Sequence, residues 1–502
     1  MSAHLLDLST YCTNLDQPVF ALHELPEEVV AVLFAYYSRS PLPLRDNLRR
    51  VLAEDLALMP GHTPTGDGAA EYAAAEERAR AFHEKWVVGY GHGSVAEHAV
   101  VHLAVEEISI VASKALEDCR LASYTEKSTR YVPFDTESYV REPTIATGPL
   151  ASLYDETCRD LLSTYGRVLA ASEAAARAEI ERPAGWTQAR YDSVCRSQAC
   201  DVARYLLPAA TRTNLGLTIN ARSLEHTLTK LYSDDLGEIR ELAGALHREA
   251  AVIVPTLVKY AAPNAHLRGR RAAVEPWIDP QPDAPPVPAT NTARLVAGPA
   301  EPLSDVAAAI LFEAGAGAWT TLRTQVAAWP AERQAELLTA YLRDRERFDA
   351  PGRALEQVTF SFELTLDYGA YRDVQRHRMC TQLGQVLDCR HGYETPPGVA
   401  AVGLADDYHR ALAASEAAWE RLAEAHGPAA AQYVLPLAWR KRLLMTANLR
   451  EWHHFISLRT GRQGHPSYRR VAQDCWHELH RAHPALAAGI RVDLADYDQA
   501  RA

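Results

Sequence analysis

The sequence predicts an α+β protein made of two tandem domains, each mostly helical with a small sheet. At 502 residues the chain is too long for one compact core. Most of it carries apolar residues with helical spacing, and a short segment in each half alternates apolar and polar residues as strands do. The residues of the second half also repeat those of the first in the same order.

The first half, residues 1–260, is predicted to be a mostly helical domain. "AVVHLAVEEIS" at 99–109 alternates as a strand does, and "IVASKALEDC" after it predicts a helix that ends near Arg120. The prolines of "SPLPL" separate the first two predicted helices. The helical segments expected elsewhere in this half are 24–40, 44–59, 69–87, 148–206 and 220–260.

A proline-rich segment, residues 261–303, separates this half from the second domain at 304–502. Proline-rich chain of this kind favours extended, semi-rigid connectors. Helical spacing returns at Ser304 and continues to about residue 348. The segment "QVTFSFELTL" then predicts a strand, followed by a helix that carries Arg376, His377 and Arg378.

An internal duplication is indicated by residues that recur at fixed spacing. "RYLLPAA" and "QYVLPLA" match at an offset of 228. In both copies an asparagine and an arginine follow the proline at the same distance, as Asn220 with Arg222 and as Asn448 with Arg450. A histidine comes next in each copy, and several such matches in one order indicate a repeat.

Composition excludes several classes of function. The net charge of −12 argues against binding to a nucleic-acid polymer, which requires a broad basic face. No apolar run is long enough to span a bilayer, and the N-terminus lacks the regions of a signal peptide, so we expect a cytoplasmic protein that does not bind a membrane. Eight cysteines without a paired motif predict free thiols and no metal site.

Four motifs resemble the flavin-dependent thymidylate synthase family. They are "GHGSVAEH" at 91–98, "RLASYTEKSTRY" at 120–131, "ARYLLP" at 203–208 and "TINARSL" at 218–224. The second half resembles the same family through "QRHR", "TANLR" and "ISLR". The resemblance implies methylation of dUMP to dTMP, with methylenetetrahydrofolate as carbon source, NADPH as reductant and FAD as cofactor. It also implies an α+β unit that forms tetramers, so we expect a homodimer of this duplicated chain.

The resemblance also implies roles for individual residues. Arg376 and Arg459 are the expected catalytic residues, because a fixed cation stabilises negative charge that develops on a uracil ring. Substrate binding is assigned to Glu126, Ser128, Thr129, Arg130, Arg204, Arg376 and Arg459. Arginine suits a nucleotide phosphate because its fork donates two charge-assisted bonds. Cofactor binding is assigned to His92, Ser94, Glu97, Arg376, His377, Arg378, Asn448, Arg450 and His454. Asn220 and Asn448 can also be read as helix caps.

Each half lacks the part of the site that the other half retains. In the first half Asp118 and Cys119 replace the first two residues of the Arg-His-Arg motif. The late arginine is replaced by Leu231 when counted from Asn220, or by Lys230 when counted back from "GEIR". In the second half Gln432 replaces the phosphate arginine, and Asp388 stands where Arg130 is expected. These complementary losses predict one composite site made from both halves. The shared sites of the family favour assembly of this site between two chains.

Two other readings remain open at the sequence level. A catalytically silent relative would bind FAD or a nucleotide as a scaffold or sensor. An active relative could also methylate another uracil nucleotide. The silent reading stays open because Thr125 and Asp373 replace the family's asparagine and glutamine.

Overall fold

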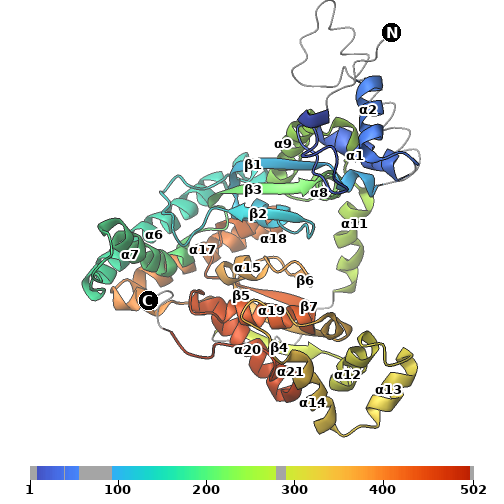
Figure 1. The fold of residues 1–502 in the computed structure, drawn as a ribbon. Coiled ribbons are helices and arrows are strands. Elements are labelled where there is room, and N and C mark those ends of the chain that lie inside the picture. The colour runs from blue at the N-terminus through green and yellow to red at the C-terminus, as the bar shows by residue number, and fades with distance from the viewer. Residues whose placement is uncertain (1–7, 39, 56–92, 279–289, 498–502) are drawn as a thin grey trace, which may run out of the picture. The chain divides into compact units, whose positions relative to one another are not determined.

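The computed structural model describes residues 8–38, 40–55, 93–278 and 290–497 (Figure 1). They have the expected α+β architecture, with long helices and two antiparallel sheets. The chain forms two compact units that do not coincide with its two halves. Unit 1 comprises Met1–Ile108, Cys119–Lys127 and Thr213–Asp279, and unit 2 comprises Ser109–Asp118, Ser128–Arg212 and Pro280–Ala502. Unit 2 therefore combines segments from both halves of the sequence.

Unit 1 contains a three-stranded sheet in the order β1-β3-β2. Its strands are β1 (Val100–Ser109), β2 (Ala122–Glu126) and β3 (Arg212–Asn220), of which Ser109 and Arg212 belong to unit 2. The helices are α1 (Glu27–Tyr37), α2 (Leu44–Asp55), α8 (Ala221–Tyr232), α9 (Gly237–Ile253), α10 (Pro255–Val258) and α11 (Ala265–Val274), with a 3₁₀ turn η4 (Val95–Glu97). The two predicted N-terminal helices are confirmed, whereas the helix predicted at 69–87 lies outside the described residues.

The first half of the chain supplies unit 2 with a long pair of helices, α6 (Ala151–Glu179) and α7 (Gln188–Ala203). The sequence predicted one helical region here, but the chain turns between them, where Pro183 and Gly185 disfavour a helix. Gly185 has a φ of 94°, in the left-handed region that glycine adopts without strain. The remaining elements are α4 (Ile110–Leu116), α5 (Pro143–Ala146) and the 3₁₀ turn η5 (Arg204–Leu206).

The second half of the chain supplies unit 2 with a four-stranded sheet in the order β4-β5-β7-β6. Its strands are β4 (Thr292–Ala297), β5 (Thr359–Asp367), β6 (Thr381–Gly384) and β7 (Arg440–Asn448). The helices are α12 (Pro302–Glu313), α13 (Trp319–Ala327), α14 (Ala331–Leu342), α15 (Tyr368–Val374), α16 (Pro397–Ala401), α17 (Ala405–His426), α18 (Pro428–Ala431), α19 (Leu449–Arg459), α20 (Pro466–Ala482) and α21 (Pro484–Ala487). Two 3₁₀ turns, η7 (Arg353–Gln357) and η8 (Gln432–Val434), complete this half.

The core of this sheet is aromatic and aliphatic. Phe362 of β5 packs on Trp452 of α19, with ring centroids 4.5 Å apart. Both side chains are fully buried, as are Phe360 and Phe455. Helix α20 covers β4 and β5. This packing fixes α15 and α19, and Arg459 is the last residue of α19. The sequence predicted a helix that carries the Arg-His-Arg motif, but α15 ends at Val374 and the motif lies in the turn and irregular chain that follow it. No helix in the described ranges is long and apolar enough to cross a bilayer.

The proline-rich segment is not extended throughout, contrary to the sequence expectation. Its "AHLRGRRAAV" stretch forms α11, because alanine, leucine and arginine favour helices and Asn264 caps the N-terminus. Its "TARLVA" stretch forms β4 and pairs antiparallel with β5 as an edge strand. Neither α11 nor β4 contains a proline, whereas Pro276 lies in the 3₁₀ turn after α11 and Pro302 begins α12.

The duplication is visible in the order of elements. The sheet order β1-β3-β2 recurs as β5-β7-β6, with the same connections through α4 and α15. Helices α4 and α15 each begin after a side-chain cap, Ser109 or Asp367. Helices α8, α9 and α10 correspond to α19, α20 and α21 in the same way. A repeat read from short motifs is thus a repeat of supersecondary structure.

Within unit 2 the two proline-containing segments pair with each other. Pro208 and Pro436 form an isolated antiparallel bridge. The Ala209 amide donates to the Leu435 carbonyl, and the equivalent Leu437 amide donates to the Leu207 carbonyl, both at 2.9 Å. Equivalent residues therefore exchange equivalent bonds, and α6 packs against its counterpart α17 (Figure 1). This arrangement brings η5 of the first half close to the second-half segments of the same chain.

Candidate functional site

Asp373 is the centre of the candidate site. It lies in the last turn of α15, three residues before Arg376. Its Oδ2 is 3.9 Å from Nη1 of Arg204, and its Oδ1 is 3.8 Å from Nη1 of Arg459. Burial would raise the pKa of Asp373, but the guanidinium groups of Arg204, Arg376, Arg459 and Arg130 together hold that pKa below its usual range. The carboxylate therefore stays charged among cations from both halves of the sequence.

Arg204 is the buried donor of the cluster. It begins η5 directly after α7, and only 2% of its side chain is exposed. Its Nε and Nη2 have no hydrogen-bond partner within the described ranges. A buried guanidinium with unsatisfied donors costs free energy, so an acceptor that reached these donors would stabilise the arginine.

Arg130 is held in place by an acidic residue on α7. Its Nε and Nη2 donate to the two carboxylate oxygens of Asp201, at 2.5 and 2.7 Å. Burial would lower the pKa of Arg130, but these bonds raise it above its ordinary value. The bonds leave Nη1 available for a ligand. Next to it, the Thr129 hydroxyl accepts a hydrogen bond from Arg372 of α15 at 3.1 Å, and the Ser128 hydroxyl accepts one from the Arg130 amide at 3.2 Å.

These contacts assemble the cluster inside one chain. Arg130 and Arg204 come from the first half, Asp373 and Arg459 come from the second, and all four lie in unit 2. Gln375 adds a link, because its side-chain amide donates to the Lys114 carbonyl at 2.9 Å. The pairing of the two proline-containing segments joins the two halves within the chain. Assembly of the site between two chains, which the family resemblance favoured, stays a prediction.

His377, the middle residue of the Arg-His-Arg motif, is a buried neutral imidazole. Arg459 donates from Nε to its Nε2 at 2.9 Å, so Nε2 carries the lone pair. Nδ1 then carries the proton and donates to Glu451 at 2.9 Å. Burial lowers the pKa of His377 to about 4, the Glu451 hydrogen bond opposes this shift, and Arg459 adds to it.

His377, Glu451 and His454 also lie close enough to suggest a metal site. A cation there would take the Nδ1 lone pair of His377 and force a proton onto Nε2, which faces the Arg459 donor. The neighbouring guanidinium adds electrostatic repulsion. This tautomer therefore disfavours a metal, although the distances among the three ligand atoms are short.

The asparagine and arginine of the N-x-R motif have structural partners in both halves. Asn448 caps α19 by accepting from the Glu451 amide, and Asn220 caps α8 by accepting from the Ser223 amide. Arg450 pairs with Glu356 at 3.0 Å. Arg222 and Glu97 form the equivalent pair at 2.5 Å in unit 1. The capping reading therefore holds, and cofactor binding by Asn448 and Arg450 stays a prediction.

The structure does not gather all the predicted site residues. His92 lies outside the described residues, and Ser94, Glu97 and Glu126 belong to unit 1. In unit 2 the His454 ring is 5.4 Å from that of His377. Arg376 is exposed and Arg378 is half-buried.

The reciprocal positions lack the cations of this cluster. Gln432, the counterpart of Arg204, donates to the Ala429 carbonyl at 2.8 Å. Asp388, the counterpart of Arg130, pairs with Arg390. Ala115 stands where the second copy has Asp373. Within the described ranges, the reciprocal positions therefore do not form a second cluster of this kind.

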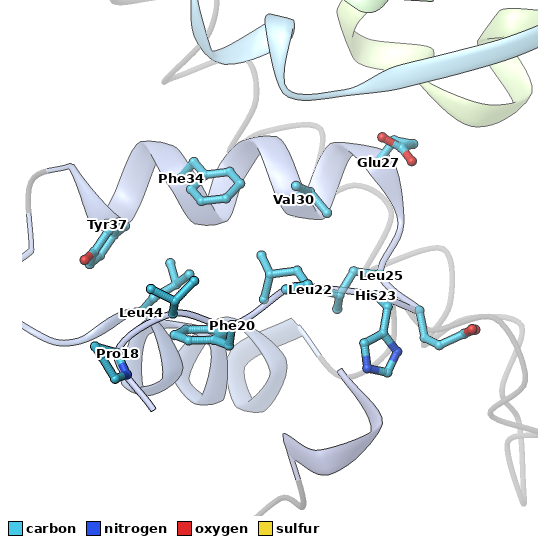
Figure 2. A pocket seen from close by; sticks show the side chains of 13 residues that line it. Pro18, Phe20, Leu22, His23, Leu25, Glu27, Val30, Phe34, Tyr37 and Leu44 are labelled. Carbon is cyan, nitrogen blue, oxygen red and sulfur yellow. The ribbon is translucent and has the colours of Figure 1, made fainter. Parts of the chain in front are cut away.

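Unit 1 contains a separate surface cavity of about 670 Å³ between α1, α2 and the segment before α1 (Figure 2). Phe20, Leu22, Val30 and Phe34 form its apolar wall. The carboxylate of Glu27 at its edge accepts from the Val100 amide at 2.8 Å. None of the predicted site residues lines this cavity.

Sequence reasoning missed Asp201 and Glu451, and it gave Asp373 no role. Asp201 stands three residues before Arg204, so both lie on the same side of the end of α7. That spacing was an available signal for an acidic partner. Glu451 stands within the "NLRE" segment, where it resembles any acidic residue in the first turn of a helix.

Comparison with known proteins identifies the family to which this chain belongs. Residues 53–256 and 300–485 match the family described as thymidylate synthase complementing protein. A UPF0159 protein of Chlamydia muridarum is 32% identical over 98% of this chain and 96% of its own length. A flavin-dependent thymidylate synthase of Thermococcus kodakarensis is 32% identical, over 34% of this chain and 61% of its own length. The chain therefore belongs to the thymidylate synthase complementing protein family, and it carries the family domain in two segments.

Proposed function

We propose that this protein is an FAD-dependent thymidylate synthase that methylates dUMP to dTMP at one composite site per chain. Methylenetetrahydrofolate would supply the carbon and NADPH the hydride that reduces it to a methyl group. The observation that supports this proposal is the convergence of Arg130 and Arg204 with Arg459 around Asp373. Each half contributes the cations that the other half lacks.

The phosphate of the nucleotide is assigned to the first-half arginines. Arg204 offers two buried donors, and Arg130 offers Nη1 beside them. Ser128 and Thr129 add hydroxyl groups from the same loop. A phosphate is bound by such convergent, charge-assisted donors in a partly buried setting. Glu126 remains a proposed substrate residue on the strand before this loop.

The uracil ring is assigned to Arg459 and Arg376. The hydrogen bond from Nε of Arg459 to His377 fixes the guanidinium group. This bond does not use the Nη1 and Nη2 atoms of Arg459. A cation oriented in advance stabilises the negative charge that the ring gains during carbon transfer. His377 stays neutral in this role, because its pKa lies near 4.

FAD fits the surface beside the Arg-His-Arg motif. Met379 and Leu383 are 75% and 63% exposed, which offers apolar contact to a flat ring system. Arg376 and Arg378 offer positive charge for its phosphates. His377, Asn448, Arg450 and His454, with His92, Ser94 and Glu97, remain the other proposed cofactor residues. When bound, FAD supplies hydride chemistry that the twenty side chains lack.

Two measurements test this proposal together. The purified protein is incubated with dUMP, methylenetetrahydrofolate and NADPH, and dTMP is quantified by chromatography. Flavin absorbance per chain is measured in the same preparation, for the wild type and for Arg378→Ala and Arg120→Ala. We expect dTMP formation, bound flavin, and a much larger loss of flavin in Arg378→Ala. Bound flavin without dTMP would instead identify a silent FAD- or nucleotide-binding relative.

One observation favours a second substrate. Asp373 replaces the glutamine of the family, and it lies in contact distance of the site arginines. Another uracil nucleotide is therefore the alternative, and the same assay with UMP in place of dUMP decides between them. Methylation of UMP without dTMP formation from dUMP would replace the first proposal.

A further inference from the structure

Asp373 is a charged acceptor without a hydrogen-bond donor. Its recorded contacts are the two arginine nitrogens at 3.8 and 3.9 Å, which lie beyond hydrogen-bond distance. Only 16% of its side chain is exposed. A buried ionised carboxylate ordinarily accepts several short hydrogen bonds, and across the described ranges this one has none. Its geometry leaves room for a donor from a ligand.

The two oxygens of Asp373 face different parts of the proposed site. Oδ2 faces Arg204, which is assigned to the phosphate, and Oδ1 faces Arg459, which is assigned to the uracil ring. In a nucleotide, the group that lies between the phosphate and the base is the sugar. The sugar of dUMP carries one hydroxyl donor, at its 3′ position.

We propose that Asp373 accepts a hydrogen bond from the 3′-hydroxyl of the bound nucleotide and thereby selects nucleotides that carry this hydroxyl. The inference rests on the proposed function and goes beyond it, because it gives a role to a residue in which this chain departs from the family motif. A carboxylate is the acceptor that nucleotide-binding proteins use for ribose hydroxyls. It cannot bind the phosphate itself, since the two negative charges repel.

A purely structural role makes a different prediction. If Asp373 only orients Arg204 and Arg459, its removal changes the affinity for every nucleotide by the same factor. If it binds the hydroxyl, its removal changes the affinity only for nucleotides that carry the hydroxyl. A comparison of two ligands therefore separates the roles, because any general effect on the arginines cancels in the ratio.

Titration calorimetry measures the Kd of dUMP and of 2′,3′-dideoxyuridine monophosphate for the wild type, Asp373→Asn and Asp373→Ala. We expect the wild type to prefer dUMP by about tenfold, as for a charge-assisted hydrogen bond of about 1.4 kcal/mol. The preference should fall to about one in Asp373→Ala and lie in between in Asp373→Asn. Circular dichroism checks that each variant folds, and Asp373→Asn carries the test if Asp373→Ala does not.

Asp201→Asn is the matched control, because Asp201 is the other acidic residue of the cluster and both its oxygens are occupied by Arg130. This variant should weaken the binding of both nucleotides by the same factor and leave the preference for dUMP over the dideoxy analogue unchanged. A preference that survives in both Asp373 variants, or that the wild type lacks, overturns this inference alone. A wild type that binds neither nucleotide overturns the proposed function and this inference with it.

Discussion

Arg204 and Gln432 occupy equivalent positions in the two proline-containing segments, and they differ in charge and in partners. Arg204 is buried, and two of its donors have no partner among the residues that the structure describes, whereas Gln432 donates to a backbone carbonyl. We expect Arg204→Ala to weaken dUMP binding about ten- to a hundredfold, as loss of a charge-assisted bond of ~1.5–3 kcal/mol requires. Gln432→Ala, the matched control, should change it little. Calorimetric titrations that give equal affinities for wild type and Arg204→Ala would remove this arginine from the site.

His377 makes stability depend on pH. Its pKa in the folded protein is about 4, below the ordinary value of about 6.5. Between these values the unfolded chain binds a proton that the folded protein does not, so stability falls as pH decreases from 6.5 to 4. The loss amounts to as much as about 3 kcal/mol. Urea unfolding across this range should show a smaller loss for His377→Gln than for the wild type. Parallel pH profiles for the two proteins would contradict this account.

The cations of the site could be named from the sequence, but their partners could not. Motif spacing identified Arg130, Arg204, Arg376 and Arg459, because several ordered motifs constrain one another. Asp201 carries no such constraint, since an acidic residue on a helix is most often solvated. The position of Asp373 among four arginines from distant segments depends on the three-dimensional fold, which spacing along the chain does not encode.

At the scale of elements, the equivalent N-caps of α19 and α8 allow the capping role of Asn448 to be tested separately from its proposed role in cofactor binding. Asn448 caps α19, the helix that carries Arg459. Asn448→Ala should lower the free energy of unfolding by about 1 kcal/mol, and Asn448→Asp should restore most of it because aspartate also caps well. Urea unfolding monitored by circular dichroism measures both. Asn220→Ala and Asn220→Asp in the equivalent cap provide the matched pair. An Asn448→Ala protein as stable as wild type would contradict the capping role.

The elements themselves were predictable where the apolar pattern was long and uninterrupted. Helices α1, α2 and α9 and strands β1 and β5 lie where the periodicity placed them. The prediction for the proline-rich segment was wrong, because its overall composition hides two short elements, α11 and β4, that contain no proline. Strand β4 also depends on β5 as its partner, and a six-residue edge strand has little signal of its own.

At the scale of the molecule, the proposed composite site has no described counterpart, because Gln432 and Asp388 stand at the positions equivalent to Arg204 and Arg130. We therefore expect one dUMP per chain in titration calorimetry. Because four family units would reproduce the family's tetramer, we also expect a homodimer in solution. Light scattering measures this, and a stable monomer of 55.4 kDa would contradict the dimer. A stoichiometry of two nucleotides per chain would contradict the single site.

The most direct test of the composite site combines two damaged chains. Arg130→Ala removes a phosphate residue from the first half, and Arg459→Ala removes a uracil residue from the second. Each variant alone should be nearly inactive, because both charges act on one bound nucleotide. The two are co-expressed with different affinity tags, and particles that carry both tags are isolated and assayed for dTMP formation. If the proposed site is built within one chain, as the proximity of Arg204 to Asp373 supports, every site in such a particle keeps one defect, and we predict no recovery of activity. Recovery of a substantial fraction of wild-type activity would show that the halves combine between chains, and full activity of either single variant would contradict the composite site itself.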